Sequence, residues 1–532
     1  MKKTIQKLMA VLLAAAMVCA MAIPAFADTE SIREHHSFKA FQIFKGNVND
    51  ASEISNVEWG SCIHNYHDFL AELKKDSTLG NQFSNADNVQ DVLAVIGKWS
   101  NSDNDSIAFA RFVCNYLYPT ADADPQPFIP TSGDVVQIPN DGAGYYLIVD
   151  TTDFSSGDDY HACNSFLLNV TQAPWNLPIT PKVEKPSVKK EVYDNPDGTS
   201  NEAGFDSSAD HAINEKFQFK LTATLPASND NDRAYDYYDK YTVTFHDTLS
   251  EGITFDHWDT VVINNGGSDI TIPPEKYTYD VSDQNLTLNI DNVKSCADGL
   301  NLNNGATITV TYTAHLNDKA RVNTASGDTK NTNKVYLTYS NNPKNSASWG
   351  KTPESEVYVF TYQLNNTKRQ DSETGDVLEG AGFRLYSDAA CNDTDEIKLK
   401  KNTTDGTYSR YFGDEAGEQM FSDDKGQFNV KGLDAGTYYL KETTTPTGFN
   451  TCPVTTVVIK ANHTGNNVDL NGSTINGKDV GASGLSTTIV NNRGTTLPST
   501  GGMGTTLFYV IGGGLMVAAI VLLVTKKRME NK

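Results

Sequence analysis

Alternation of apolar and polar residues dominates the chain after about residue 187 and predicts short β-strands. Apolar side chains recur at every second position in stretches such as Phe217 to Leu225 and Val335 to Tyr339. Successive side chains of a strand point to opposite faces, so one face of each strand should enter a core. Turn-forming residues separate the stretches, for example Asn264 to Gly267. The pattern therefore predicts tandem Ig-like β-sandwich domains over 189–345 and 355–492.

The region 28–173 differs, because apolar residues recur there at helical spacing between strand-like stretches. Three stretches have apolar residues three or four positions apart, as on one face of a helix: Tyr66 to Lys74, Val89 to Trp99 and Ile107 to Tyr118. Strand-like stretches flank them at Phe38 to Phe44, Gly144 to Val149 and Phe166 to Val170. We therefore expect a mainly β protein with one mixed α+β domain at its N-terminal end.

Both ends of the chain carry an apolar run beside basic residues. Near the start, Lys2, Lys3 and Lys7 precede an apolar stretch, and Ala25-Phe26-Ala27 is a small-x-small cleavage site. This order predicts a signal peptide over residues 1–27. Near the end, the uncharged run 507–524 precedes Lys526-Lys527-Arg528. That order predicts a transmembrane helix followed by a cytoplasmic basic tail at 525–532.

The charge balance is strongly acidic and argues against nucleic acid as a partner. The chain has 43 basic and 66 acidic residues, and without residues 1–27 and 501–532 it keeps 36 basic and 65 acidic residues. A surface with that excess repels polyanions. We find no paired-carboxylate or Ser/His/Asp spacing, and His64 and His67 fit a solvated helix face better than a metal site. The sequence therefore predicts no enzyme in the usual sense, no cofactor and no metal site.

The residues Leu497-Pro498-Ser499-Thr500-Gly501, a spacer, the apolar run and the basic tail follow one another in order. This order resembles the cell-wall sorting signal of Gram-positive surface proteins. In that family a sortase cuts between threonine and glycine, here Thr500 and Gly501, and joins the threonine carbonyl to an amine. The resemblance implies secretion, transient membrane anchoring and covalent attachment to peptidoglycan at the cell surface.

The stretch 174–188 contains four prolines, which bar a regular helix and indicate an extended linker. Trp175 and the residues Ile179-Thr180-Pro181-Lys182 loosely resemble the pilin motif W-x-x-x-V-x-V-Y-P-K of sortase-assembled pili, with Thr180 in place of the tyrosine. The resemblance implies that Lys182 is the acceptor amine for Thr500 of the next subunit. The alternative is a solvated linker lysine.

The region 355–492 contains the run Tyr438 to Phe449, YYLKETTTPTGF, which resembles the E-box of CnaB-type pilin domains. Alternation places Glu442 on the apolar face with Leu440, where a carboxylate without partners is costly. The family pairs this acid with a lysine on the first strand and an asparagine on the last, which here are Lys368 and Asn491. Asn491 is two positions after Ile489 and shares its parity, which means that both side chains point to the same face of the strand, whereas the competing Asn492 points to the other face.

The resemblance implies a chemical role for these three buried side chains. Burial would leave Lys368 as a neutral amine and Glu442 as a protonated acid. The acid would hydrogen-bond the amide oxygen of Asn491, and attack by the amine would expel ammonia and leave an isopeptide bond. The alternative is a hydrogen-bonded cluster that does not react.

The region 189–345 looks like the related CnaA-type domain, in which the acid is an aspartate. Lys190 shares parity with the apolar positions around it, whereas Lys189 points the other way. Asp247, followed by threonine and leucine, fits the acid of the family, and Asn333 fits the amide on the last strand. Asn331 is the competing choice for that amide.

Six cysteines remain once the signal peptide is removed. Cys391 and Cys452 are alone in the third region, and we predict a disulfide between them. Cys296 is alone in the second region and should be unpaired, and the pairing of Cys62, Cys114 and Cys163 stays open. The first region has Lys39 and Asn169 on an early and a late strand but no acid within a motif, which leaves an isopeptide bond there open.

Together, the motifs resemble the backbone (major) pilin of sortase-assembled Gram-positive pili. The resemblance implies a structural shaft subunit that supports adhesion and colonisation. Its partners would be other copies of itself, minor pilins, a class C pilus sortase, a housekeeping sortase and peptidoglycan; the host receptor stays open. The alternative is an LPXTG-anchored adhesin that binds a host or matrix ligand and does not polymerise.

Overall fold

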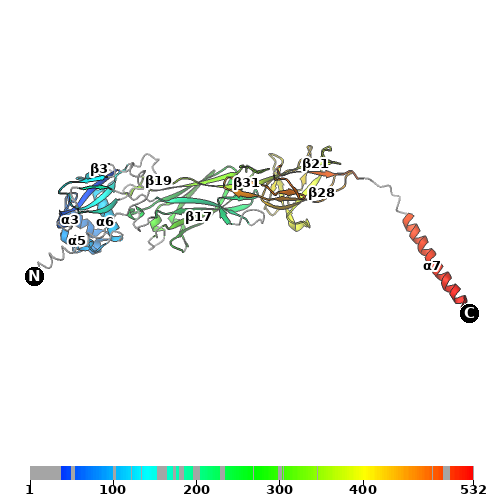
Figure 1. Ribbon diagram of the computed structural model, residues 1–532, viewed down its shortest axis with the longest axis horizontal. Coiled ribbons are helices and arrows are strands. Elements are labelled where there is room, and N and C mark those ends of the chain that lie inside the picture. Colours follow the sequence, from blue (N-terminus) through cyan, green and yellow to red (C-terminus); the bar gives the residue numbers. More distant parts are fainter. Residues whose placement is uncertain are drawn as a thin grey trace. The chain divides into compact units, whose positions relative to one another are not determined.

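A computed structural model describes most of residues 37–494 and residues 504–530 (Figure 1). The description omits the short stretches 49–53, 100–103, 121–122, 133–134, 153–164, 172–174, 179–184, 196–203, 228–233, 268, 297–301, 303–304, 344–345 and 482. The chain divides into two units. The first runs to Gln363 and also takes in Lys431–Gly436 and Ile459–Ser473, and the second contains the remaining residues.

The N-terminal region is a sheet covered by short helices, as its mixed pattern predicts. Its strands follow the order β6-β5-β1-β3-β4-β7, with β2 added to β1. The strands are β1 (Phe38–Val48), β2 (Ile54–Trp59), β3 (Ile129–Ser132), β4 (Val135–Ile138), β5 (Gly144–Asp150), β6 (Ser165–Val170) and β7 (Trp175–Pro178). The helices are α3 (Tyr66–Lys75), α4 (Gly80–Phe83), α5 (Val89–Ile96) and α6 (Asn104–Leu117).

Local sequence explains where two of these helices begin. The Asn65 side chain accepts a hydrogen bond from the Asp68 N–H at the start of α3, and the Asn88 side chain does the same for two N–H groups at the start of α5. These caps satisfy N–H groups that have no partner within the helix. The apolar faces of the helices, including Phe69 and Phe109, then pack into a buried cluster with Phe41 and Leu147 of the sheet.

The second region is a sandwich of two mostly antiparallel sheets, whose orders are β14-β13-β17-β11-β8-β9 and β10-β20-β18-β12-β16-β15, with β19 added to β18. The first sheet contains β8 (Ser187–Asp194), β9 (Gly204–Asp206), β11 (Lys216–Thr224), β13 (Ile253–Asn264), β14 (Asp269–Thr271) and β17 (Thr307–Leu316). The second contains β10 (Ser208–Asp210), β12 (Val243–Leu249), β15 (Thr278–Ser282), β16 (Asn285–Ile290), β18 (Asn331–Ser340), β19 (Trp349–Lys351) and β20 (Ser355–Phe360). One core joins alternate residues of both sheets, including Phe219, Phe245 and Leu337.

The third region also has two sheets, with orders β24-β25-β27-β21-β34 and β23-β22-β28-β29-β32-β33, with β26 added to β22. The first contains β21 (Tyr362–Gln370), β24 (Leu399–Lys401), β25 (Tyr408–Arg410), β27 (Val430–Leu433) and β34 (Ser486–Asn491). The second contains β22 (Gly382–Tyr386), β23 (Glu396–Ile397), β26 (Met420–Phe421), β28 (Gly436–Thr444), β29 (Thr455–Ile459), β32 (Thr474–Ile475) and β33 (Lys478–Asp479). The mainly β architecture expected from alternation is confirmed.

The start of the third region differs from the expected residue 355. Strand β20 pairs with β10 and β18 of the second region, and the division between the units lies after Gln363. The alternation of β20 gives its strand character, but sequence alone does not show which sheet takes it up.

Two later segments of the chain also belong to the first unit. In one of them, Gly432 has φ of +76° and its carbonyl accepts a hydrogen bond from the Ile213 N–H at 3.0 Å. A Cβ at Gly432 would lie 2.3 Å from the Ile213 side chain, so only glycine fits there. The other segment carries the hairpin β30 (Asn462–Thr464) and β31 (Asn467–Asp469), whose Val468 exchanges two backbone hydrogen bonds with Gly327.

A long helix, α7 (Gly504–Glu530), closes the chain. Its stretch Phe508–Met529 is the one described helix that is long and apolar enough to cross a membrane. The expected apolar helix at the C-terminal end is confirmed, and it extends beyond residue 524 into the basic residues.

Candidate cross-link sites

In the third region, the predicted lysine and asparagine lie on neighbouring strands. Strands β21 and β34 are parallel, and Lys368 is opposite Ile489 while Gln370 is opposite Asn491. Alternation turns the side chains of both predicted residues inward, where each is fully buried. Glu442 reaches them from β28 in the facing sheet and is also buried.

The three side chains form a continuous chain of polar contacts. The Lys368 Nζ donates to Asn491 Oδ1 at 2.5 Å, and the Asn491 Nδ2 donates to Glu442 Oε1 at 2.7 Å. The same Glu442 oxygen lies 3.8 Å from the Lys368 Nζ. Its other oxygen accepts a hydrogen bond from the backbone N–H of Cys452 at 2.8 Å, which fixes the carboxyl group in place.

The surroundings of Lys368 favour an uncharged amine. Burial lowers the pKa of Lys368, although the neighbouring Cys452 thiol and Glu442 carboxyl group oppose part of that shift. The ring of Phe383 lies 5.3 Å from Nζ and stacks on Phe428, so the amine faces aromatic carbon on that side. A neutral amine has a free electron pair and can act as a nucleophile.

This arrangement can form an isopeptide bond without an added reagent. The Lys368 Nζ attacks Cγ of Asn491, a bond forms between these atoms, and the bond from Cγ to Nδ2 breaks. Glu442 lies close to both nitrogens, so its carboxyl group can accept the proton that the amine loses and supply one to the departing nitrogen, which leaves as ammonia. No net proton is gained or lost.

One detail corrects the expectation from sequence. We expected Glu442 to hydrogen-bond the amide oxygen of Asn491, but the structure places it on the amide nitrogen and places Lys368 on the oxygen. The acid therefore faces the leaving group. Parity along a strand shows which face a side chain occupies, but it does not show which end of the partner amide it meets.

In the second region, the predicted residues meet between the two sheets. Lys190 comes from β8, and Asp247 and Asn333 come from β12 and β18 of the facing sheet. Lys190 Nζ donates a hydrogen bond to Asp247 Oδ2, and both side chains are at most 1% exposed. Asn333 is also fully buried, and its Oδ1 has no hydrogen bond among the described residues.

Tyr312, on β17, connects all three side chains and was not predicted. Its hydroxyl donates to Asp247 Oδ2 at 3.2 Å and accepts from Lys190 Nζ at 3.2 Å and from Asn333 Nδ2 at 2.6 Å. The only sequence signal for Tyr312 is its inward parity in an alternating strand, which many core tyrosines share. Its polar role comes from contacts among four strands.

The pKa shifts of this pair favour the neutral forms. Burial lowers the pKa of Lys190 to about 8, although the charge of Asp247 opposes the shift. Burial likewise raises the pKa of Asp247 against the effect of Lys190. An amine and a carboxylic acid are the protonation states that amide formation requires.

The competing residues are accounted for by other contacts. Asn331 exchanges hydrogen bonds with the backbone of Arg321, at 2.9 and 3.1 Å. Lys189 faces solvent and pairs with Glu191 at 2.8 Å. Asn492 is exposed, as its parity predicts.

The predicted disulfide between Cys391 and Cys452 is not present, and both residues are free thiols. The reason lies in strand geometry. The Cys452 thiol is beside Lys368 and Glu442, whereas the Cys391 thiol is beside Lys441. Glu442 and Lys441 are consecutive in β28, so their side chains point to opposite faces. Cys62 and Cys296 are free as well.

The structure does not bring together the lysine and asparagine of the first region. Lys39 is opposite Val149 in β5, whereas Asn169 is opposite Tyr145, four residues earlier in that strand. Lys39 instead pairs with the exposed Asp124 at 2.8 Å. Cys163, Lys182 and the sorting residues Leu497, Pro498, Ser499, Thr500 and Gly501 lie outside the described residues, as does the signal peptide.

Comparison with protein families gives two matches. Residues 365–474 match the SpaA family, described as a prealbumin-like fold domain, and residues 489–531 match the LPXTG cell wall anchor motif. The chain carries a SpaA-type domain and a cell-wall anchor. Both matches confirm the resemblance drawn from the E-box and the sorting signal, and the protein is anchored to the cell wall at the surface.

Comparison of the chain with solved structures gives further similarities. The chain is similar to the pilus 2b backbone protein of group B streptococcus (23% identity, TM-score 0.39, 54% of this chain and 97% of that one). It is also similar to the T6 backbone pilin of serotype M6 Streptococcus pyogenes (16% identity, TM-score 0.46, 87% of this chain and 97% of that one). A third similar structure is the major pilin SpaD of Corynebacterium diphtheriae (19% identity, TM-score 0.39, 71% of this chain and 88% of that one). No curated protein sequence matches the chain.

We predict that the purified extracellular chain is lighter than its sequence by two molecules of ammonia. Glu442→Ala should restore one ammonia and Asp247→Ala the other, because each substitution removes the acid of one site. Intact-mass spectrometry measures this directly. The exposed substitution Glu415→Ala is the matched control and should keep both losses. A wild-type mass equal to that of the sequence would contradict the chemistry at both sites.

We further predict that Tyr312→Phe slows bond formation in the second region by roughly 10- to 100-fold. Charge develops on Lys190 and Asp247 as the amine attacks, and a hydrogen bond to a charged group contributes roughly 1.5–3 kcal/mol. The ring stays and only the hydroxyl is lost. The measurement is the mass of freshly synthesised chain followed over time. Tyr336→Phe, on strand β18 of the facing sheet, is the control. Equal rates in Tyr312→Phe and wild type would show that the hydroxyl plays no part.

Proposed function

We propose that this protein is the shaft subunit of a covalently polymerised pilus whose domains are closed by intramolecular Lys–Asn isopeptide bonds. The observation that supports this most strongly is the presence of a buried lysine, acid and asparagine in each of two consecutive β domains. Buried charges or polar groups of this kind are costly unless they are paired. Their repetition in two domains with different geometry favours a chemical role over an incidental cluster.

The proposed bonds suit a protein that carries tension. In the third region the bond would join β21 to β34, the first and last strands, which are 123 residues apart at the bonded positions. Closing a loop of this length removes freedom from the unfolded chain and contributes about 5 kcal/mol in the chain-entropy description used for disulfides. The bond, unlike a disulfide, is not broken by thiols. The protein would act as a structural element, and each site would react once.

Polymerisation is the second part of the proposal. A class C sortase would cut the anchor between Thr500 and Gly501 and join Thr500 to Lys182 of the next subunit, and a housekeeping sortase would transfer the base of the fibre to peptidoglycan. The cell-wall anchor and the motif around Trp175 and Lys182 support this step. Minor pilins would be further partners.

We predict that Lys182→Arg abolishes the ladder of high-mass species seen when cell-wall extracts are separated under denaturing conditions. Arginine keeps the positive charge but removes the acceptor amine. Lys185→Arg, in the same linker, is the control and should keep the ladder. A ladder that survives Lys182→Arg would assign the acceptor elsewhere. The absence of any ladder from wild-type cells that contain a pilus sortase would favour the adhesin that does not polymerise.

A further inference from the structure

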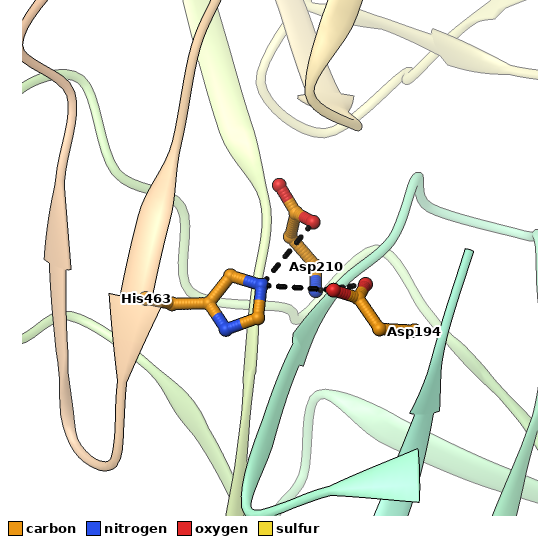
Figure 2. A group of neighbouring side chains, drawn as sticks. All are labelled: Asp194, Asp210 and His463. Atoms are coloured by element: carbon orange, nitrogen blue, oxygen red, sulfur yellow. Dashed lines mark hydrogen bonds and ion pairs between the residues drawn. The ribbon is translucent and has the colours of Figure 1, made fainter. Parts of the chain in front are cut away.

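A second buried polar cluster lies in the first unit and plays no part in the cross-links. It consists of Asp194 at the end of β8, Asp210 at the end of β10 and His463 on β30 (Figure 2). His463 comes from the segment Ile459–Ser473, which belongs to this unit although its sequence neighbours belong to the other one. Figure 2 shows both carboxyl groups turned toward the same imidazole nitrogen.

The distances between these side chains match a metal centre. The His463 Nε2 lies 3.1 Å from Asp194 Oδ2 and 3.6 Å from Asp210 Oδ1, and one ligand atom from each residue lies within 4.8 Å of the others. Bonds of about 2.0–2.1 Å to a tetrahedral metal ion place neighbouring ligand atoms about 3.3–3.4 Å apart. The two distances between the imidazole and the carboxylates are close to these values, so the three side chains can converge on one ion.

Asp210 gives an independent indication that a ligand is missing. Its side chain is 1% exposed, yet neither carboxylate oxygen has a hydrogen bond. The buried hydroxyl of Tyr362 approaches it without reaching hydrogen-bond geometry. Asp194 is better satisfied, because its Oδ1 accepts from the Asp210 N–H at 3.2 Å. A buried carboxylate that has no hydrogen bond and only an imidazole at 3.6 Å is costly unless a cation neutralises it.

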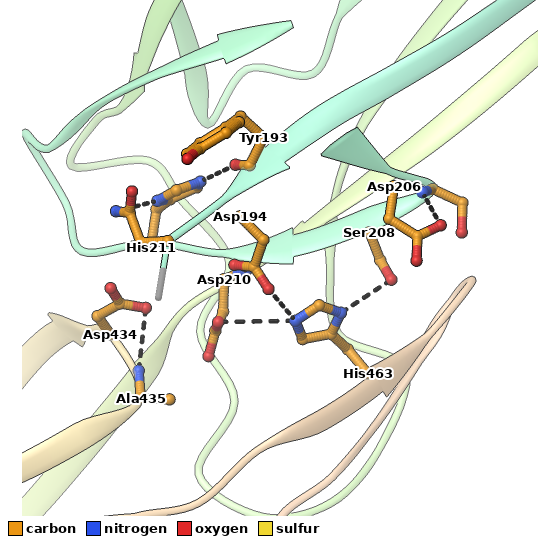
Figure 3. A network of polar contacts seen from close by, with 11 residues as sticks. Tyr193, Asp194, Asp206, Ser208, Asp210, His211, Asp434, Ala435 and His463 are labelled. Atoms are coloured by element: carbon orange, nitrogen blue, oxygen red, sulfur yellow. Dashed lines mark hydrogen bonds and ion pairs between the residues drawn. The ribbon is translucent and has the colours of Figure 1, made fainter. Parts of the chain in front are cut away.

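The net charge of the cluster suits a divalent ion. Within the described part of the chain, His463 is the only cationic partner of the two aspartates. A protonated imidazole would leave a net charge of −1 in a buried site, whereas a neutral imidazole with a divalent cation leaves none. The Ser208 hydroxyl bonds the other ring nitrogen, Nδ1, at 2.9 Å and so holds the ring with Nε2 toward the carboxylates (Figure 3).

A neighbouring cluster provides a contrast within the same view. His211, Glu215 and Asp434 also lie close together, but each of them already has a hydrogen-bond partner outside the group. His211 Nε2 bonds the Tyr193 carbonyl at 2.7 Å, and Asp434 Oδ1 accepts from the Ala435 N–H at 3.0 Å (Figure 3). We therefore assign no ion to this second cluster.

We propose that Asp194, Asp210 and His463 bind one divalent transition-metal ion, for which Zn²⁺ is the best match to an imidazole and two carboxylates. The ion would join two nearby strands to a hairpin that follows 269 residues after Asp194. It would fasten the hairpin β30–β31 to β8, the same strand that carries Lys190, and to β10. The site would thus be a metal brace within the first unit, in addition to the proposed covalent bonds.

The test is a titration of the full chain, purified in detergent and stripped with a chelator, with ZnCl₂ in a calorimeter. We expect binding of one Zn²⁺ per chain that Asp210→Asn and His463→Gln each weaken at least tenfold. His257→Gln is the control, because His257 is 58% exposed and pairs with Asp259 at 3.2 Å. It should bind as wild type does.

A melting experiment separates loss of the ion from loss of the fold. Without metal, Asp210→Asn should melt at or above the wild-type temperature, because it removes an uncompensated charge. Zn²⁺ should raise the melting temperature of wild type and of His257→Gln but not of Asp210→Asn. Wild-type affinity and stabilisation in both Asp210→Asn and His463→Gln would overturn the proposal, and so would the absence of Zn²⁺ binding by wild type.

Discussion

Water is excluded from the ε-amino groups of Lys190 and Lys368, and the proposed chemistry of the protein depends on that exclusion. Both side chains are fully buried against aromatic rings, at 5.0 Å from Phe219 and 5.3 Å from Phe383. Burial disfavours the charged ammonium, so the pKa of each lysine falls. The alternation that builds the β-sandwich therefore also makes the nucleophile, because inward parity is what places the lysine in the core.

The two domains bring the same three kinds of side chain together from different strands and sheets. In the third region the amine and the amide are on adjacent parallel strands of one sheet, and the acid comes from the facing sheet. In the second region the amine is on one sheet, while the acid and the amide are on the other. There the Tyr312 hydroxyl fills the space between the side chains. A bond in the second region would tie two sheets together, whereas one in the third would tie the first strand to the last.

Much of the fold and of both triads could be predicted from the sequence, because each rests on local parity. Inward parity selects Lys190 over Lys189 and Asn491 over Asn492, and motifs supply the acids. The remaining features depend on contacts that parity does not specify. Strand β20 joins the sheet of the second region, Tyr312 bridges three side chains from other strands, and Cys452 faces away from Cys391. His463 meets Asp194 only because a distant segment of the chain belongs to the first unit, and no local sequence pattern predicts this contact.

The most direct test of the central claim is peptide mapping of the native extracellular chain after digestion with trypsin. Burial of each lysine in a cluster with its asparagine predicts two branched peptides, one joining Lys368 to Asn491 and the other joining Lys190 to Asn333. Each should be lighter than its two parts by one ammonia. Recovery of linear peptides with unmodified Lys190, Lys368, Asn333 and Asn491 from correctly folded protein would contradict the claim.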